Sequence, residues 1–350
     1  MKKRKWLSLG LVLTMALSGT VMFTGCGGKD TAEVTEWSFY SAYGPEDSAC
    51  SVIWADLFEQ IKEETDGKLV INAYWSGQHP YEGSDMLKVV NDGTAELTHF
   101  YSGYIASVEP ALAVDGLPLL FPTDSMKAWE INQALWGNFE QNLDGPLEKI
   151  LQENWNASMI HMLPATSMRL LTKGYKSDGL GSLEGHKIRV YSAEFSKFVE
   201  LLGGTPVTLA SSEVVTSLSQ NLIDGLITSV VFADQLGFFD YVDTINLWEI
   251  SQSSDGLMVN MDALNALPED VKETFLRIMH DSASKPEMKE LDDNNAKVLE
   301  LKDAGIDVVE VIPADRAALA AIVEKELWTP WAENAGESGT EIIDFIKSYK

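Results

Sequence analysis

The sequence predicts an α/β fold. Residues 183–231 read as strand, helix, strand, helix and strand in succession, which is the repeating unit of a parallel sheet. The rest of the chain alternates short apolar runs with helical patterns, separated by turns rich in Gly, Pro, Asn and Asp. The length of 350 residues, with 45% hydrophobic and 23% charged residues, suits two domains or one large one.

Within residues 183–231, nearby residues predict where each strand and helix begins and ends. Lys187–Val190 is the first predicted strand, and the polar pair Tyr191 and Ser192 ends it. The helix that follows has apolar residues at i, i+3, i+4 and i+7 and stops at two glycines: Phe195, Phe198, Val199, Leu202, Gly203 and Gly204. The remaining predictions are a strand at Thr205–Val207, a helix from Ser211 or Ser212, and a strand at Leu226–Val231.

Further strands and helices are expected on both sides of this stretch. The predicted strands are 36–40, 68–75, 96–101, 158–163, 167–172, 247–251, 256–261 and 307–312. The predicted helices are 48–64, a short one from Ser84, one from Thr123 or Asp124 to Phe139, 146–154, helices from Pro268 to about Ala304, and one ending near Leu327. The two tryptophans at the start of the 328–350 tail are expected to be packing anchors.

The N-terminus has the pattern of a secretory signal. Four cationic residues lie in Met1–Lys5, and an apolar run from Trp6 to Phe23 follows. The small residue before Cys26 and the two glycines after it resemble a bacterial lipobox, in which the cysteine is lipidated and becomes the new N-terminus. The expectation is therefore a lipoprotein signal peptide at 1–25 and a tether at 26–33, with a plain signal peptide or an uncleaved anchor as the alternative.

Net charge excludes several partners. The formal charge is −27, and removal of residues 1–25 takes away four of the 26 cationic side chains and none of the 53 acidic ones, which gives −31. Such a surface repels nucleic acid. A protein this acidic that binds an anion must concentrate positive charge inside its binding site, so an arginine in a predicted interior position is informative.

Known cofactor and metal patterns are missing from the sequence. The five histidines form no H-E-x-x-H or Cys/His cluster, so a metal site has no support. A dinucleotide fingerprint, a P-loop and a G-x-S-x-G elbow are absent as well, and we expect no cofactor. Paired carboxylates are plentiful in an acidic chain, so a secreted hydrolase of the glycosidase type stays open as the enzyme alternative.

Arg189 is the first candidate ligand-binding residue. It lies at the end of a predicted strand of a parallel unit, where open α/β sheets hold their ligands. A guanidinium fork matches the geometry of a carboxylate and forms bidentate pairs with it. The alternative for Arg189 is a solvated or salt-bridged surface residue.

Residues around Arg189 resemble a known signature. G-x-K-I-R-V at 185–190, G-G-x-P-V at 203–207 and E-V-V-x-x-L-x-x-x-x-I-D-G at 213–225 are similar to segments of TRAP (tripartite ATP-independent periplasmic) transporter substrate-binding proteins of the dicarboxylate-binding type. The resemblance extends over residues 34–350. It implies a two-lobed periplasmic-binding-protein-like fold, type II-like, with a ligand cleft between the lobes. It also implies that Arg189 pairs with the carboxylate of a small organic acid.

The same resemblance implies the domain boundaries and the partners. Lobe one is expected at 34–165 with 254–293, and lobe two at 166–253 with 294–350. The protein is expected to be extracytoplasmic, lipid-anchored through Cys26, and to deliver its ligand to the membrane subunits of a TRAP transporter. It is not expected to be an enzyme. A surface lipoprotein with a structural role is a third possibility.

A second group of residues is expected to line the cleft. Arg169, twenty residues before Arg189, matches a position where many relatives have a second basic residue; the alternative is a surface arginine on an edge strand. The weaker candidates are Tyr101, Ser102, Ser41, Tyr191 and Thr228. Core or rim packing is the alternative for Tyr101.

Two departures from the family pattern leave the ligand open. Ser211 stands where many relatives have an aromatic residue before the E-V pair, and Thr228-Ser229 stands where many have an Asn-Pro-like pair. Both changes affect the distal side of the expected ligand. Sialic acid, sugar acids, short dicarboxylates, hydroxy acids and aromatic acids are all compatible with the sequence.

Overall fold

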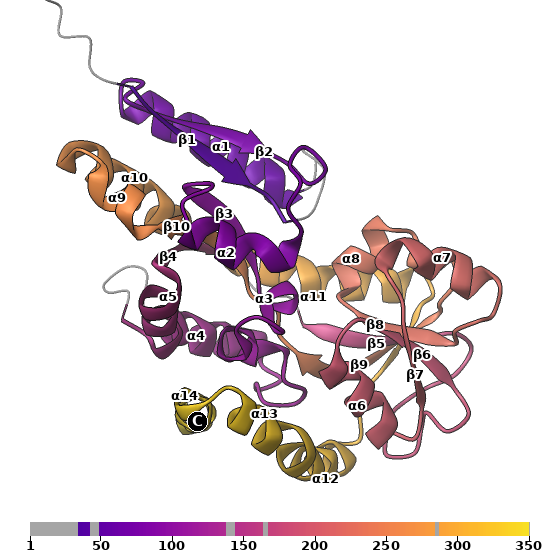
Figure 1. The fold of residues 1–350 in the computed structure, drawn as a ribbon. Helices are drawn as coiled ribbons and strands as arrows, with labels where there is room; N and C mark the ends of the chain where they lie inside the picture. Colours follow the sequence, from indigo (N-terminus) through magenta and orange to yellow (C-terminus); the bar gives the residue numbers. More distant parts are fainter. Residues whose placement is uncertain (1–33, 43–48, 138–143, 164–166, 284–286, 350) are drawn as a thin grey trace, which may run out of the picture. The chain divides into compact units, whose positions relative to one another are not determined.

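Two β-sheets organise the chain (Figure 1). The computed structural model describes residues 34–42, 49–137, 144–163, 167–283 and 287–349. The predicted signal peptide at 1–25 and the tether at 26–33, including Cys26, lie outside the described residues.

The first sheet, sheet A, has the strand order β2-β1-β3-β10-β4. Its strands are β1 Thr35–Tyr40, β2 Leu69–Tyr74, β3 Leu97–Tyr101, β4 Ala157–Leu163 and β10 Asp255–Asn260. The first three run parallel, whereas β10 is antiparallel to both of its neighbours. A strand from late in the chain, coloured orange in Figure 1, is thus inserted between β3 and β4.

The second sheet, sheet B, has the order β11-β9-β5-β8-β6-β7. Its strands are β5 Met168–Thr172, β6 Lys187–Val190, β7 Thr205–Thr208, β8 Gly225–Thr228, β9 Thr244–Ser251 and β11 Asp307–Val309. The strand β6 is parallel to both β7 and β8, which confirms the parallel unit predicted from residues 183–231. The strand β5 is inside the sheet, so the edge-strand alternative for Arg169 is wrong.

Helices cover both sheets. Those of the first half are α1 Ala49–Glu64, η1 Gly83–Asp85, α2 Met86–Asn91, α3 Ser102–Ile105, η2 Pro110–Gly116, α4 Ser125–Trp136 and α5 Pro146–Trp155. Those of the second half are α6 Ala193–Leu201, α7 Ser211–Ser219, α8 Val230–Gln235, η3 Phe238–Asp240, α9 Met261–Ala266, α10 Glu269–Ala283, α11 Glu287–Asp303, α12 Pro313–Val323, η4 Glu324–Trp328, α13 Thr329–Asn334 and α14 Glu337–Ser348.

Alternation of side chains divides sheet B into two apolar faces. Ile188, Val190 and Ile227 belong to the largest core cluster, whereas Leu171 and Leu226 belong to a separate cluster with residues of α7 and α8. Successive residues of a strand point to opposite faces, so odd positions of β6 and even positions of β8 share the α7 and α8 face. This geometry fixes the face to which the candidate arginine on β6 points.

The chain passes between the two sheets more than once. It does so between β4 and β5, and again between β9 and β10 through Gln252, Ser253 and Ser254, all of which are buried. The strands of sheet A and sheet B therefore come from discontinuous parts of the sequence. Near the C-terminus, the Trp328 indole donates a hydrogen bond to the carbonyl of Pro118 (2.9 Å), and α14 packs against η2.

Several predicted boundaries differ from the structure. The strand predicted at 226–231 ends at Thr228, because the Ser229 hydroxyl accepts a hydrogen bond from the Phe232 amide and starts α8. The helix capped by Asp124 ends at Trp136, followed by Gly137 with φ 88°. The last strand ends at Val309 rather than 312, because Ile312 already serves as the N-cap of α12, which Pro313 opens.

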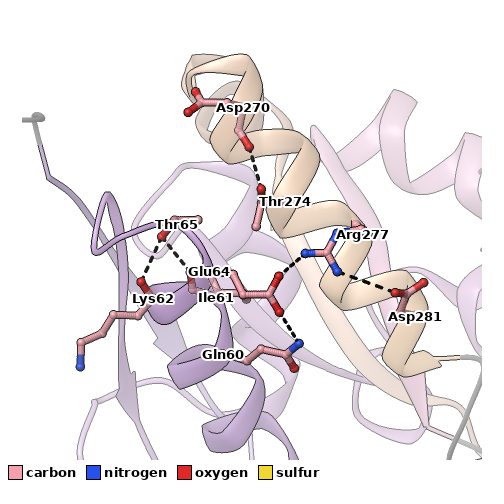
Figure 2. A network of polar contacts seen from close by, with 9 residues as sticks. All are labelled: Gln60, Ile61, Lys62, Glu64, Thr65, Asp270, Thr274, Arg277 and Asp281. Atoms are coloured by element: carbon pink, nitrogen blue, oxygen red, sulfur yellow. Dashed lines mark hydrogen bonds and ion pairs between the residues drawn. The ribbon is translucent and has the colours of Figure 1, made fainter.

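A polar network ties α1 to α10 at the surface of the molecule. Figure 2 shows the Arg277 guanidinium of α10 between Glu64 of α1 and Asp281, with Gln60 donating to the second oxygen of Glu64. These groups are substantially exposed, so each ion pair contributes little to stability. The apolar face of α1, with Trp54 and Ile61 fully buried, supplies most of the packing against sheet A.

One buried histidine of sheet A makes no side-chain hydrogen bond to the described residues. His161 of β4 is fully buried, and neither ring nitrogen has a hydrogen-bond partner among the described residues. Burial, opposed by Asp255 and aided by His280, lowers its pKa to about 4. The ring therefore stays neutral in the folded protein at any pH above about 4.

We predict that His161 makes the fold less stable in mild acid. Below pH 6.5 the unfolded chain binds a proton at this residue that the folded chain does not bind until about pH 4. The free energy of unfolding then falls as the pH is lowered from 6.5 to 4, by about 2–3 kcal/mol from this group. Urea denaturation of the wild type and of His161→Leu at pH 7 and pH 5 measures the difference. An equal loss in both proteins contradicts the prediction.

Candidate functional site

Three predicted site residues share one face and one edge of sheet B. Arg169 pairs with Thr228 across β5 and β8, and Arg189 of β6 pairs with Leu226 of β8. The carboxyl ends of the parallel strands β6 and β8 meet at this edge, where open α/β sheets place their ligand sites. Arg169 joins them because β5 is antiparallel and begins there.

Arg189 is a buried cation without a carboxylate partner. Its side chain is on the α7 face, the residue is 3% exposed, and no Asp or Glu among the described residues lies within ion-pair distance of it. Its Nε donates to the carbonyl of Leu209 (3.0 Å) and its Nη2 to the Ser211 hydroxyl (3.4 Å). Burial lowers the pKa of Arg189, although an arginine stays charged at neutral pH. A buried charge of this kind calls for an anion.

Tyrosines surround the free side of this guanidinium. The Arg189 guanidinium carbon lies 5.3 Å from the ring centre of Tyr191, in cation–π range, and Tyr101 and Tyr104 are its other electrostatic neighbours. The hydroxyls of Tyr191 and Tyr101 are hydrogen-bonded to each other, and Ser253 bonds to Tyr101. Burial raises the pKa of Tyr101 to about 12, so its phenol is neutral and able to donate.

A cavity of about 60 Å³ lies beside the two tyrosines. The ends of β3 and β6 contribute Tyr101, Ser102, Tyr191 and Ser192 to its wall, and the β9–β10 crossover contributes Gln252 and Ser253. The other lining residues are Gly103, Ala106, Pro110, Ala113, Gly116, Glu194, Phe195, Trp331 and Asn334. The cavity is therefore built from strand ends of both sheets and from the crossover between them.

Arg169 has a different environment from Arg189. Its Nε and Nη2 both lie 2.9 Å from Glu249 Oε1, and the two side chains are only 7% and 10% exposed. Glu249 itself has φ 45°, in the left-handed region that non-glycine residues rarely adopt. The prediction that Arg169 contacts a ligand carboxylate stays a prediction, and its charge is already paired within the protein.

Asp115 fixes the crossover behind the cavity. Its Oδ2 accepts hydrogen bonds from the Ser254 amide and from the Ser102 hydroxyl (3.0 Å), and its backbone carbonyl accepts from the Gln252 amide (3.0 Å). Burial raises the pKa of Asp115 to about 6, and these hydrogen bonds act against the shift. The Gln252 side chain in turn donates to the Ser167 hydroxyl (2.9 Å), which links the two crossover segments.

The predicted candidates thus divide into two groups. Tyr101, Ser102 and Tyr191 line the cavity, whereas Arg169 and Arg189 do not; the Arg189 guanidinium lies 5.3 Å from the ring centre of Tyr191. Ser41 and Thr228 are buried and do not line it: the Ser41 carbonyl bonds to His79 Nε2 (2.9 Å), and Thr228 is in β8 opposite Arg169.

Sequence reasoning missed Glu249, Asp115, Gln252 and Asn334. Nothing local distinguishes Glu249 or Asp115 from the other 51 acidic residues of the chain.

Family comparison agrees with this geometry. The family model for bacterial extracellular solute-binding protein, family 7 (DctP), matches residues 43–334. A Salmonella typhimurium protein described as uncharacterized protein YiiZ is 26% identical over 172 residues, which is 48% of this chain and 49% of that protein. The chain therefore spans about half the length of that relative.

Solved structures share the fold. An extracytoplasmic solute receptor of Bordetella pertussis binding pyroglutamic acid has a TM-score of 0.73 at 19% identity, covering 90% of this chain and 100% of that one. A TRAP periplasmic solute-binding protein from Chromohalobacter salexigens with bound d-glucuronate gives 0.75 at 18% identity, with the same coverage. One from Desulfovibrio salexigens with bound orotic acid gives 0.73 at 19%, covering 90% and 98%. Identities this low show the fold, which is the two-lobed periplasmic solute-binding fold predicted from the sequence.

Two features are absent from the described part of the chain. Within it, no helix has the length and apolar character needed to cross a membrane. The same residues contain no group of three or more His, Cys, Asp or Glu side chains placed to hold a metal ion.

We predict that Arg169 and Glu249 depend on each other for stability. Arg169→Met leaves a buried carboxylate unpaired and is expected to cost about 3–5 kcal/mol of unfolding free energy. The double variant Arg169→Met/Glu249→Met removes both charges and is expected to recover most of that loss, because an apolar pair of similar length fills the same space. Urea denaturation of the wild type, Arg169→Met, Glu249→Met and the double variant measures it, and additive losses contradict the ion pair.

Proposed function

Because this chain belongs to the bacterial extracellular solute-binding protein family 7, we propose that it captures a small organic acid outside the cytoplasmic membrane for a TRAP transporter. In this proposal it delivers the acid to the membrane subunits of the transporter. The family consists of solute-binding receptors rather than enzymes, so the glycosidase alternative has no support.

One observation carries the proposal: the guanidinium of Arg189 is buried and has no carboxylate partner among the described residues. Its remaining N–H groups are free to form a bidentate pair with a carboxylate. Tyr101 and Tyr191, two neutral phenols that are hydrogen-bonded to each other, line the same cavity together with Ser102. An acid bound here would satisfy Arg189 at the meeting point of the two sheets.

Ligands of the structural relatives have the same chemistry. Pyroglutamic acid, d-glucuronate and orotic acid, named for the Bordetella, Chromohalobacter and Desulfovibrio proteins, all carry a carboxyl group attached to a polar ring or chain. This supports an organic acid as the ligand of the present chain. It does not distinguish among them, because Ser211 and Thr228 differ from the common family pattern.

Ligand capture would use closure of two lobes, for which we propose 34–165 with 254–293 and 166–253 with 294–350. The cavity wall combines β3 and β6, one from each proposed lobe, and the Tyr101–Tyr191 hydrogen bond joins them. A ligand that touches both walls binds the closed arrangement more tightly than the open one and shifts the equilibrium toward it. Exclusion of water then strengthens the pair between Arg189 and the carboxylate.

Arg189→Met is expected to abolish acid binding while the protein stays folded. Loss of one partner of a buried charge pair costs about 2–5 kcal/mol, or about 30-fold to several thousandfold in Kd. Arg189→Lys is expected to bind poorly as well, because an ammonium cannot form the bidentate pair. A thermal-shift screen over organic acids identifies the ligand, and calorimetry then measures Kd for each variant. Arg277→Met, at the exposed network of Figure 2, is the matched control; equal Kd for Arg189→Met and the control contradicts the assignment.

We propose in addition that Cys26 is lipidated and anchors the protein to the membrane. The support is the charged and apolar N-terminal pattern with a small residue before the cysteine. Two or more acyl chains hold a protein firmly at a bilayer, whereas one chain binds weakly and reversibly.

Cys26→Ser is expected to release the protein from membranes. In a bacterial host, the wild type is expected to incorporate labelled palmitate and to partition into the detergent phase of Triton X-114. The variant is expected to lose both properties and to keep its ligand affinity, since residue 26 lies outside the binding unit 34–350. A wild type that carries no label and stays in the aqueous phase contradicts the anchor.

A further inference from the structure

The two arginines on the α7 face of sheet B differ in whether a carboxylate of the protein neutralises their charge. The charge of Arg169 is neutralised by Glu249, through two contacts of 2.9 Å to one carboxylate oxygen in a nearly buried setting. Arg189, on the same face, has only a carbonyl, a hydroxyl and aromatic rings around it. Both side chains are nearly buried, so solvent compensates neither of them.

A local irregularity of β9 brings Glu249 to Arg169. The register between β5 and β9 shifts between Met168 and Leu170, which pair with Ser251 and Asn246, so the segment containing Glu249 bulges opposite Arg169. Within that segment Glu249 adopts φ 45°. Arg316 of α12 holds the bulge from outside by donating from Nε to the Trp248 carbonyl (3.1 Å) and from Nη2 to the Glu249 carbonyl (3.3 Å). A strained backbone held by a second arginine indicates that the position of this carboxylate is fixed.

The wall of the cavity contains no positive charge, because neither Arg169 nor Arg189 is among the residues that line it. Glu194 is the one charged residue among those that line it, and the rest are neutral. The buried carboxylate of Asp115 lies behind the same wall and bonds to the lining residue Ser102. A second carboxylate on the ligand would therefore face acidic groups in a region of low dielectric constant, where repulsion between like charges is strong.

We propose that the site accepts acids with a single carboxylate and rejects dicarboxylates, and that Glu249 determines this selectivity by occupying Arg169. The inference rests on the proposed function, since it assigns the ligand carboxylate to Arg189. The distal part of the ligand is uncharged, and it meets amide, hydroxyl and aromatic groups such as Asn334, Ser192 and Trp331. Glu249 is a specificity-determining residue that acts through Arg169.

Matched pairs of acids test the selectivity. The thermal-shift library contains gluconate with glucarate and glutaramate with glutarate, which differ only in whether the distal end is neutral or a carboxylate, together with other pairs built in the same way. For each pair that gives a shift, calorimetry measures both Kd values with the wild type. We expect the monocarboxylate to bind at least tenfold more tightly than its dicarboxylate partner.

Variants of the ion pair test the role of Glu249. Glu249→Gln keeps the shape of the side chain and releases Arg169, so we expect the ratio of dicarboxylate to monocarboxylate affinity to rise at least tenfold. The double variant Arg169→Met/Glu249→Met keeps the fold if the single change is too destabilising, and we expect it to bind the monocarboxylate within about threefold of the wild type. Glu341→Gln, at an exposed position of α14, is the matched control with an unchanged ratio.

The outcomes separate this inference from the proposed function. If no acid in the library stabilises the wild type, the proposed function fails and this inference fails with it. If acids bind but dicarboxylates equal or exceed their partners, or the double variant loses monocarboxylate affinity more than tenfold, the selectivity is wrong and the proposed function stands. An unchanged ratio in folded Glu249→Gln overturns the role of Glu249 alone.

Discussion

A guanidinium buried at the end of β6, with no acidic partner among the described residues, is the constraint around which the site is arranged. Removing a charge from water is costly unless another charge or several hydrogen bonds replace the solvent. Here the replacement is incomplete, since the Leu209 carbonyl and the Ser211 hydroxyl satisfy only two of the five N–H groups. The fold tolerates this because rigid strands fix the position of Arg189. An anion that binds there supplies the missing opposite charge and hydrogen-bond acceptors.

The surroundings of Arg189 explain why a cavity forms there and how its two walls are held. Tyr101 ends a strand of sheet A and Tyr191 follows a strand of sheet B, their hydroxyls are hydrogen-bonded, and the Tyr191 ring centre lies 5.3 Å from the Arg189 guanidinium carbon. Behind them, Asp115 ties η2 to the β9–β10 crossover through the amides of Gln252 and Ser254. The crossover is consequently a hydrogen-bonded part of the wall rather than a loose linker. A change in the angle between the sheets would have to rearrange these particular bonds.

Much of this could be predicted from sequence, because the signals are local. The parallel unit at 183–231 follows from apolar periodicity and glycine stops, and the strand-end position of Arg189 follows from that unit. Tyr101, Ser102 and Tyr191 were found because each directly follows or ends a predicted strand. One boundary failed where a local cap overrode strand propensity: the β-branched pair Val230-Val231 lies in a helix because Ser229 caps it.

Glu249 shows what local signals cannot supply. It is 80 residues from Arg169, it lies in a strand that looks regular in sequence, and it reaches its partner only through a bulge and a left-handed backbone angle. A family motif that assigns a role to Arg169 from its position in the sequence carries no information about that bulge. Two arginines twenty residues apart, on one face of one sheet, therefore differ in whether their charge is available. The distinction depends on where the nearest carboxylate lies in space, and only the three-dimensional arrangement of β5, β9 and α12 determines it.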